Sequence, residues 1–393
     1  MSFATESGPE NVVTIKVVGV GGAGNNVVNR MVKSGTQGIE YVAVNTDKQA
    51  LAVSSADQKI QIGEKLTHGQ GAGSDPDVGK RSAEESRNNI AKSLENADMV
   101  FITAGMGGGT GTGAAPTIAD IAREAGILTV GVVTKPFKFE GKRRMDQAMV
   151  GINELLGKVD SLLIIPNDRL KFATDQKVTL ANAFEIADDV LRQAVVSISD
   201  LIKNTGFINL DFADVTCVMK DAGFAHMGVG RAAGKGKAED AARMAVASPL
   251  METSINGARG VLINITGSED MGLEDVETAA NLVQEAAHPD ANIIFGASVD
   301  PSLDDEIRVS VIATGFDEPG KAQAEAAPAA AAAPAAPAAG MYTAAATAAT
   351  AAPAAAPAPA AAPAAPAAAP AADAAAPAEE DPFDSIFKIF NSK

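Results

Sequence analysis

The feature that most constrains the fold is a ten-residue loop, Ala104–Gly113, in which six residues are glycine. An apolar run at 98–103 precedes this loop, and a helical pattern at 114–126 follows it, with Pro116 near the expected helix start. Glycine leaves no Cβ between the backbone and an anion, and the amide groups at a helix N-terminus bind phosphate well. A strand, a glycine loop and a helix in this order predict a phosphate-binding loop rather than a flexible turn.

A second unit of the same kind begins the chain. An apolar run at 12–20 is followed by Gly21-Gly-Ala-Gly-Asn-Asn26 and by a helical pattern at 27–33. Further strands are expected at 41–47, 59–62, 128–134 and 161–165, with helical segments between them. This alternation predicts an α/β fold with a doubly wound parallel sheet, whose ligand sites lie at the carboxyl ends of the strands.

The C-terminal half has a different pattern. Apolar positions at 180–204 repeat with helical spacing, which predicts a long helix that connects two domains. Strands expected at 260–266, 292–296 and 306–314 predict a second, smaller α/β domain with a mixed sheet. The glycine-rich stretch 223–236 is interpreted as strand ends and turns.

These patterns divide the chain into six segments. They are a disordered start at 1–11, a nucleotide-binding domain at 12–179, a connecting helix at 180–204, a C-terminal domain at 205–316, a disordered Ala/Pro-rich linker at 317–380 and a terminal peptide at 381–393. The prolines prevent the alanines of the linker from forming one continuous helix.

Composition excludes several classes of protein. The net charge of −17 disfavours a nucleic-acid binder and a protein that adheres directly to anionic lipid. The single cysteine, Cys217, excludes an intramolecular disulfide and a multi-cysteine zinc site; it lies in an apolar helical stretch and is expected in the protein core rather than as a nucleophile. We see no signal peptide and no stretch that spans a bilayer, so a cytoplasmic protein without membrane insertion is expected.

The terminal peptide regains bulky apolar residues. Phe383, Ile386, Phe387 and Phe390 recur with the spacing of one helical face. Because this short stripe has no core of its own, it is either a disordered end or, as we favour, a peptide that binds a partner's groove.

The residues alone leave a second function open. Gly19-Val-Gly-Gly-Ala-Gly24 is a variant of the dinucleotide-binding pattern, and Asp47 lies near the distance at which such a site recognises ribose. An NAD(P)-dependent oxidoreductase is therefore the runner-up, although a single pyrophosphate does not require the second loop at 107–113. A P-loop is excluded, because the nearest approach, at 73–81, has the wrong spacing and an arginine where Ser or Thr belongs.

Several motifs in the same order resemble the tubulin/FtsZ family of GTPases. They are Gly107-Gly-Gly-Thr-Gly-Thr-Gly113, Gly21-Gly-Ala-Gly-Asn-Asn26, Asn45-Thr-Asp47, Thr134-Lys-Pro-Phe137 and Asn209-Leu-Asp-Phe-Ala-Asp214. The resemblance covers about residues 12–316. It implies a tubulin-like fold, GTP and GDP as ligands, Mg²⁺ bound mainly through the nucleotide with no metal site of side chains, and head-to-tail assembly with other copies of this chain.

The resemblance also implies a role in the cell. The family's bacterial members form the cytokinetic ring at midcell, on the inner face of the membrane, where tethering and regulatory division proteins bind the C-terminal peptide. Here residues 381–393 differ in order from the family's usual Asp-Ile/Val-Pro-x-Phe-Leu-Arg/Lys pattern, so the identity of the tether is open. A related filament for DNA segregation is the alternative.

The resemblance assigns residues to the nucleotide. The expected phosphate contacts are Gly21, Gly22, Ala23, Asn25, Asn26, Gly105, Gly107, Gly108, Gly109, Thr110, Gly111, Thr112 and Gly113. Glu140 and Arg144 match the family's ribose and nucleotide contacts. Phe184 would stack on guanine, and Asp188 would accept hydrogen bonds from its N1 and N2 groups, which adenine does not offer.

The predicted catalytic residues are Asn209, Asp211 and Asp214. By resemblance they form a loop that completes the active site of the next subunit, where they position and polarise the attacking water. An aspartate at a helix start is commonly only a cap, and Asp211 is expected to cap as well.

Overall fold

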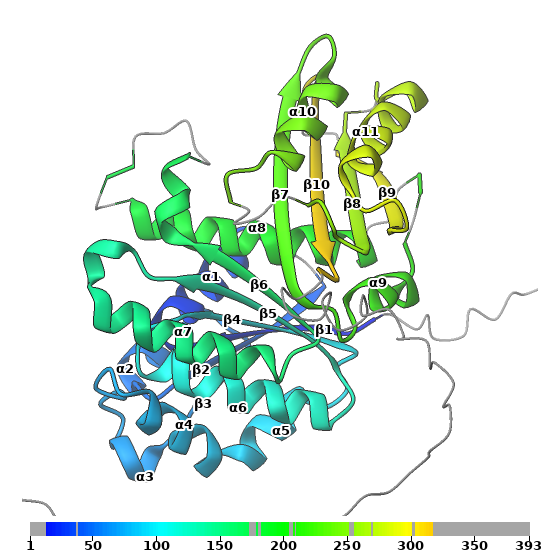
Figure 1. Ribbon diagram of the computed structural model, residues 1–393. Coiled ribbons are helices and arrows are strands. Elements are labelled where there is room, and N and C mark those ends of the chain that lie inside the picture. Colours follow the sequence, from blue (N-terminus) through cyan, green and yellow to red (C-terminus); the bar gives the residue numbers. More distant parts are fainter. Residues whose placement is uncertain are drawn as a thin grey trace, which may run out of the picture. The chain divides into compact units, whose positions relative to one another are not determined.

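The computed structural model describes residues 13–36, 38–172, 178–179, 182–203, 207–208, 210–250, 255–268, 270–300 and 303–316 (Figure 1). The chain divides into two compact units, Met1–Pro328 and Ala329–Lys393, and all described residues belong to the first. The predicted segments 1–11, 317–380 and 381–393 lie outside the described residues, and so does Asn209.

The described residues form one ten-stranded sheet with the order β3-β2-β1-β4-β5-β6-β7-β10-β8-β9. The strands are β1 (Ile15–Val20), β2 (Ile39–Asn45), β3 (Gln58–Gln61), β4 (Met99–Gly105), β5 (Leu128–Lys135), β6 (Ser161–Pro166), β7 (Gly223–Ala233), β8 (Gly260–Gly267), β9 (Asn292–Val299) and β10 (Glu306–Thr314). From β3 to β7 every neighbouring pair is parallel, whereas β10 runs antiparallel to both β7 and β8. The predicted doubly wound parallel sheet and the mixed pairing of the C-terminal strands are confirmed, but both belong to one continuous sheet because β6 pairs with β7.

Helices cover both faces of the parallel strands. The helices are α1 (Gly21–Lys33), α2 (Lys48–Ala52), α3 (Glu64–Thr67), α4 (Pro76–Glu85), α5 (Arg87–Leu94), α6 (Thr110–Glu124), α7 (Lys142–Leu156), α8 (Ala183–Lys203), α9 (Phe212–Met219), α10 (Lys237–Val246) and α11 (Leu273–Ala286), with 3₁₀ turns η1 (Lys138–Glu140) and η2 (Asn167–Phe172). One apolar cluster joins the strands to α1 and α8, and a second joins them to α5, α6 and α7 (Figure 1). Because side chains alternate along a strand, Val17 enters the first cluster and Val18 the second.

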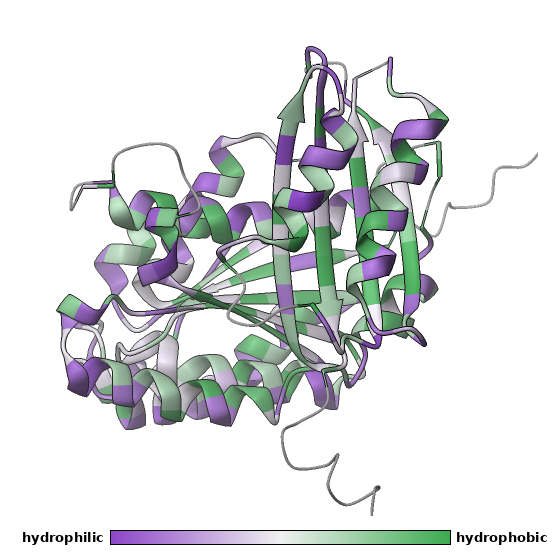
Figure 2. Cartoon of the chain, turned by 45° about the horizontal axis from the view of Figure 1, so that its top comes forward, coloured by the Kyte–Doolittle hydropathy of each residue, from purple (hydrophilic) through white to green (hydrophobic). Residues whose placement is uncertain are grey.

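The C-terminal strands have a core of their own. Alanines of α10 and the apolar face of α11 pack on β8 and β10, and Figure 2 shows these strands as largely hydrophobic beneath helices with hydrophilic outer faces. Within the described residues, no helix is long and apolar enough to cross a membrane.

The stretch 223–236 departs from its prediction. It contains a continuous strand, β7, that pairs with β6 over three residues and with β10 along nine. Gly228 and Gly230 lie in this strand because a Cβ at either position would overlap the carbonyl oxygens of Ala245 and Ala241 on α10. The glycines allow a helix to approach the strand closely, and the interpretation as strand ends and turns was wrong.

Two smaller predictions were also wrong. Both helices that follow the glycine loops begin inside those loops, at Gly21 and Thr110, so that Pro116 lies within α6 rather than at its start. Cys217 is exposed, because α9 buries the side chains of Val215, Val218 and Met219 and turns the cysteine away from them.

Candidate functional site

The two glycine loops lie next to each other. Strands β1 and β4 are parallel neighbours, paired from Ile15 with Met99 to Val20 with Ala104, so the helices that follow them start at the same edge of the sheet. A Cβ on Gly21 would stand 2.9 Å from the amide nitrogen of Gly111, which shows that the loops are in contact. The N-termini of α1 and α6 therefore converge on one place.

Both helix starts are suited to an anion. In the described part of the chain neither α1 nor α6 has a side-chain cap, and neither carries an acidic residue in its first turn. Uncapped N-terminal amides carry partial positive charge and need acceptors. An added Cβ at Gly22 or at Gly108 would meet no described atom within 4 Å, so the loops are open on that side.

Gly107 and the threonines shape the second loop. Gly107 has φ +98°, and a Cβ there would lie 2.6 Å from the backbone oxygen of Arg144 on α7. The amide of Gly107 donates to Thr112 Oγ1 at 2.8 Å, so this buried hydroxyl holds the loop in shape. The hydroxyl of Thr110 shares a hydrogen bond of 2.7 Å with that of Thr46, which follows β2. The loop is thus braced by α7 and by the neighbouring strand.

Asn25, on the first turns of α1, is the clearest sign of a missing polar ligand. Its side chain is buried, and neither its nitrogen nor its oxygen has a hydrogen-bond partner among the described residues. Leaving a buried polar group unpaired costs about 1–3 kcal/mol. A phosphate or its bound water at the loops would supply the partners that the protein itself does not.

Glu140 and Arg144 form the next part of the site. Glu140 Oε1 accepts a hydrogen bond of 2.9 Å from the amide of Phe137, and Glu140 Oε2 lies 3.1 Å from Arg144 Nε. The side chain of Arg144 is half exposed beside Gly107. The positive charge of Arg144 therefore lies at the edge of the glycine loop, where it would stabilise a bound phosphate.

Three aromatic rings form the part of the candidate site that contains η1 and the start of α8. Phe137 stacks on Phe139 with centroids 5.1 Å apart and meets Phe184 of α8 edge-on at 5.5 Å. Phe137 and Phe139 line a cavity of about 360 Å³ together with Asn167 and the start of α8. The flat faces of a planar base fit such surroundings.

The sequence reasoning missed Asn167. This residue follows β6 directly, its side chain is buried, and its Oδ1 has no hydrogen-bond partner within the described residues. An amide oxygen in a cavity accepts hydrogen bonds from a base. Its position after the strand at 161–165 is the signal that could have found it, because sites form at the carboxyl ends of parallel strands.

Asp188 lies on α8, one turn after Phe184. The pKa of its carboxyl is raised from 3.8 to about 6, mainly by burial and also by the charge of Glu185, although Arg30 on α1 acts to lower it. Arg30 Nε lies 3.4 Å from Asp188 Oδ2, and another nitrogen of Arg30 lies 3.5 Å from Glu185. The site therefore contains a poorly solvated carboxyl group that changes its charge near pH 6.

Asp211 and Asp214 lie at the start of α9, outside the group of residues described so far. Asp214 N donates to Asp211 Oδ1 at 2.7 Å and Asp211 N donates to Asp214 Oδ2 at 3.3 Å, so the pair forms a capping box at the start of α9. The expected capping by Asp211 is confirmed.

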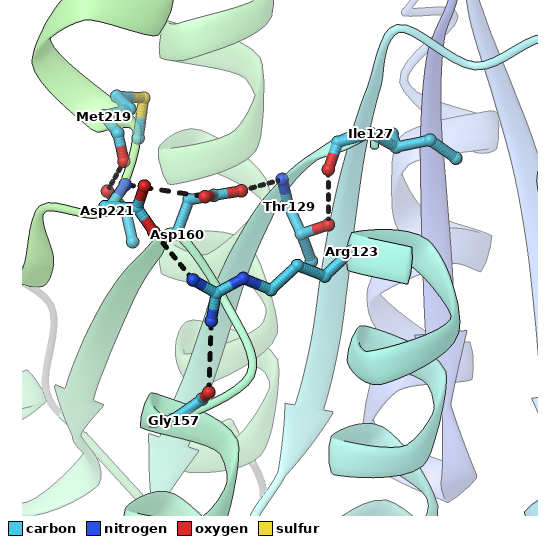
Figure 3. Close-up of polar contacts among 8 residues, drawn as sticks. Arg123, Ile127, Thr129, Gly157, Asp160, Met219 and Asp221 are labelled. Atoms are coloured by element: carbon cyan, nitrogen blue, oxygen red, sulfur yellow. Dashed lines mark hydrogen bonds and ion pairs between the residues drawn. The ribbon is translucent and has the colours of Figure 1, made fainter. Parts of the chain in front are cut away.

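The C-terminal end of α9 is hydrogen-bonded to the beginning of β6, at the opposite ends of the strands from the glycine loops. Ser161, the first residue of β6, donates to the carbonyl oxygen of Met219, and Asp160 receives the amides of Thr129 and Asp221 (Figure 3). Arg123, near the end of α6, donates to Asp221 Oδ1 at 2.7 Å. These contacts lie where strands begin, whereas the glycine loops lie where strands end.

Comparison with known proteins identifies the family. The model of the tubulin/FtsZ family GTPase domain matches residues 14–175, and that of the FtsZ family C-terminal domain matches residues 223–317. The chain is similar to an empty FtsZ dimer from M. jannaschii, with 45% sequence identity, a TM-score of 0.74, and coverage of 77% of this chain and 88% of that chain. This chain belongs to the tubulin/FtsZ family. It is a cytoskeletal GTPase that binds guanine nucleotides.

Two further structures agree with the tubulin/FtsZ fold. A point mutant of FtsZ from M. jannaschii shares 45% identity with a TM-score of 0.75, over 77% of this chain and 91% of that chain. CetZ2 from Haloferax volcanii, in a GTPγS-bound protofilament, shares only 21% identity with a TM-score of 0.65, over 79% of this chain and 96% of that chain, and supports the fold alone. The oxidoreductase alternative was wrong. Asp47, its expected ribose ligand, instead caps α2 by accepting from the amides of Gln49 and Ala50.

Proposed function

We propose that this GTPase assembles head-to-tail into protofilaments and that each nucleotide is hydrolysed at the contact between two subunits. The observation that carries the proposal is that the glycine loops and α9 lie at opposite ends of the strands. The glycine loops follow the strands' carboxyl ends, and α9 is anchored where β6 begins. A strand of six or seven residues spans about 20 Å, so the anchored end of α9 lies about one strand length from the glycine loops, and in this proposal Asp211 and Asp214 act on a neighbouring subunit's nucleotide.

In this proposal the glycine loops and Asn25 bind the phosphates, and Arg144 offsets part of their charge. The magnesium ion is held mainly by the phosphates themselves, where it neutralises charge that develops during hydrolysis. Glu140 contacts the ribose, Phe184 stacks on the base, and Asp188 accepts from guanine N1–H and N2–H. A pair of oxygen acceptors suits guanine, which presents two adjacent donors there.

Asp211 and Asp214 of one subunit would orient the attacking water at the γ-phosphate bound to the next, together with Asn209. Among the described residues, the capping box uses one oxygen of each carboxylate, which leaves the other for water or a cation. Positioned carboxylates of this kind contribute about 10²–10⁴ in rate. A contact that joins two different surfaces does not close, so it builds a filament.

In the cell we propose that the filament is the cytokinetic ring at midcell. Residues 12–179 bind nucleotide, 180–204 connect, 205–316 complete the neighbour's site, and 317–380 link the cytoplasmic filament to 381–393. That terminal peptide would bind membrane-tethering and regulatory division proteins. A fluorescent fusion that forms a band at the division site supports this role, whereas one that follows segregating DNA would favour the alternative filament.

The biochemical test is light scattering after addition of GTP, with GDP as the control, combined with the rate of GTP hydrolysis at increasing protein concentration. We expect scattering with GTP alone and a rate per molecule that rises steeply from high-nanomolar to tens of micromolar protein. A rate per molecule that stays constant over this range would refute a site shared between subunits.

A further inference from the structure

Arg30 joins the first helix of the nucleotide domain to the helix that carries the expected base-recognising residues. It lies in the last turn of α1, and its guanidinium faces both Glu185 and Asp188 on α8. These two acidic residues are three positions apart and so lie on one face of their helix. None of the motifs that identify the family contains Arg30.

The surroundings of Asp188 make its charge costly. Its side chain is only 10% exposed, and Glu185 adds a second negative charge on the same helix face. The next acidic residue of α8, Asp189, is held away from this pair by hydrogen bonds to Arg192 and Gln193. From the neighbouring helix α1, Arg30 supplies the positive charge that stabilises the ionised carboxylate.

We propose that Arg30 is a positioning residue for guanine recognition, which keeps the Asp188 carboxylate ionised and directed toward the base before nucleotide arrives. The inference rests on the proposed role of Asp188. Arg30 Nε bonds Oδ2 of Asp188. Each carboxylate oxygen accepts more than one hydrogen bond, so both oxygens stay available to guanine N1–H and N2–H.

Protonation of Asp188 would destroy this match. A protonated carboxyl directs an O–H group toward N1–H and N2–H, which are both donors. Affinity for guanine nucleotide should therefore fall as the pH drops below the pKa of the empty site, by a factor that approaches tenfold for each pH unit. Arg30 and Glu185 shift that pKa in opposite directions, so their removal should move the pH profile in opposite directions.

The test is equilibrium binding of GDP between pH 5.5 and 8.5, since GDP avoids the assembly that GTP is proposed to cause. In Arg30→Gln the midpoint of the profile should move up by about one pH unit, because an opposite charge within about 4–6 Å shifts a carboxyl by one unit or more. GDP affinity should then fall about threefold at pH 6.5, approach a tenfold loss toward pH 5.5, and match the wild type at pH 8.5. Arg30→Lys keeps the charge and should restore most of the wild-type profile.

Glu185→Gln is the matched control, because it removes the opposing charge and should move the midpoint down. Titration of the GDP phosphates is common to all variants, so differences between variants report on Asp188. Melting temperatures without nucleotide check that each variant is folded. If Arg30→Gln lowers affinity equally at every pH, or if Glu185→Gln moves the midpoint in the same direction, the inference is overturned.

Asp188→Asn separates the inference from the proposed function. If Asp188→Asn flattens the pH profile while Arg30→Gln leaves the midpoint unchanged, the role of Arg30 fails and that of Asp188 stands. If Asp188→Asn keeps the wild-type profile and the wild-type preference for GDP over ADP, the proposed role of Asp188 fails as well.

Discussion

Substitution of adjacent glycines in the phosphate loop should separate folding from nucleotide binding. Gly107→Ala places a residue with a side chain at φ +98° and sets its Cβ 2.6 Å from the backbone oxygen of Arg144. The left-handed backbone costs an L-residue about 1–2 kcal/mol, and the forced shift of packed backbone costs about 1–3 kcal/mol more. We therefore expect Gly107→Ala to lose about 2–5 kcal/mol of folding stability, with distortion of the loop.

Gly108→Ala is the matched control. Gly108 has an ordinary φ, and an added Cβ meets no described atom within 4 Å. Its stability should stay within about 0.5 kcal/mol of the wild type, as for other substitutions that touch nothing. The new methyl group, however, points into the open side of the loop, where the phosphate is proposed to bind, so affinity for GDP should fall.

The assay is thermal melting without nucleotide, followed by titration with GDP. For a domain of 150–250 residues, the loss in Gly107→Ala corresponds to a fall in melting temperature of roughly 5 °C or more. Equal melting temperatures for the two variants would refute the packing of Gly107 against α7. A Gly108→Ala protein that binds GDP as tightly as the wild type would show that the phosphate does not face the open side.

Three further predictions concern other parts of the site. Asp214→Ala should bind GDP normally but lose turnover by about 10²-fold or more, with about 1 kcal/mol lost from the cap of α9, and a loss of GDP binding would contradict its placement. Because burial raises the pKa of Asp188 from 3.8 to about 6 in the folded protein, its ionisation opposes folding as the pH rises through this range. The empty Asp188→Asn protein should therefore melt above the wild type at pH 7.5, by up to about 3 kcal/mol in stability, and the difference should shrink at pH 4.5; a lower melting temperature at pH 7.5 would count against it. Exposed Cys217 should react with a thiol reagent in the native protein, and GTP-driven assembly should slow the reaction if α9 enters the subunit contact.

Local patterns were sufficient for the parallel half of the fold. Apolar runs that end in glycine loops identified β1, β4 and the helices after them, because burial on both faces makes a strand almost entirely apolar, with Lys16 and Thr103 as the polar exceptions. The helix starts were misplaced, since α1 and α6 begin within their glycines at Gly21 and Thr110. The free-energy cost of glycine in a helix is small compared with the free energy gained when the helix packs on the sheet.

The β7 strand shows where local patterns fail. Its glycines suggest turns when only neighbours in sequence are considered. They are required by α10, whose backbone lies against Gly228 and Gly230. Likewise, the burial of α9 is set by the strands beneath it, which take Val215 and Val218 but not Cys217. In both cases the residues that make the contact are distant in sequence, so the local pattern does not predict it.

The sequence by itself determined the glycine loop at Ala104–Gly113, because only glycine combines positive φ with an open backbone at a helix start. It also determined the family, through motifs in a fixed order. The tertiary structure decided what lies beside the loop. The pairing of β1 with β4 brings two helix starts together, Arg30 meets Asp188 from a helix more than 150 positions away, and Asn167 lines a cavity with Phe137 and Phe139. Charge and burial at a site are properties of neighbours in space, so they follow only once the chain has folded.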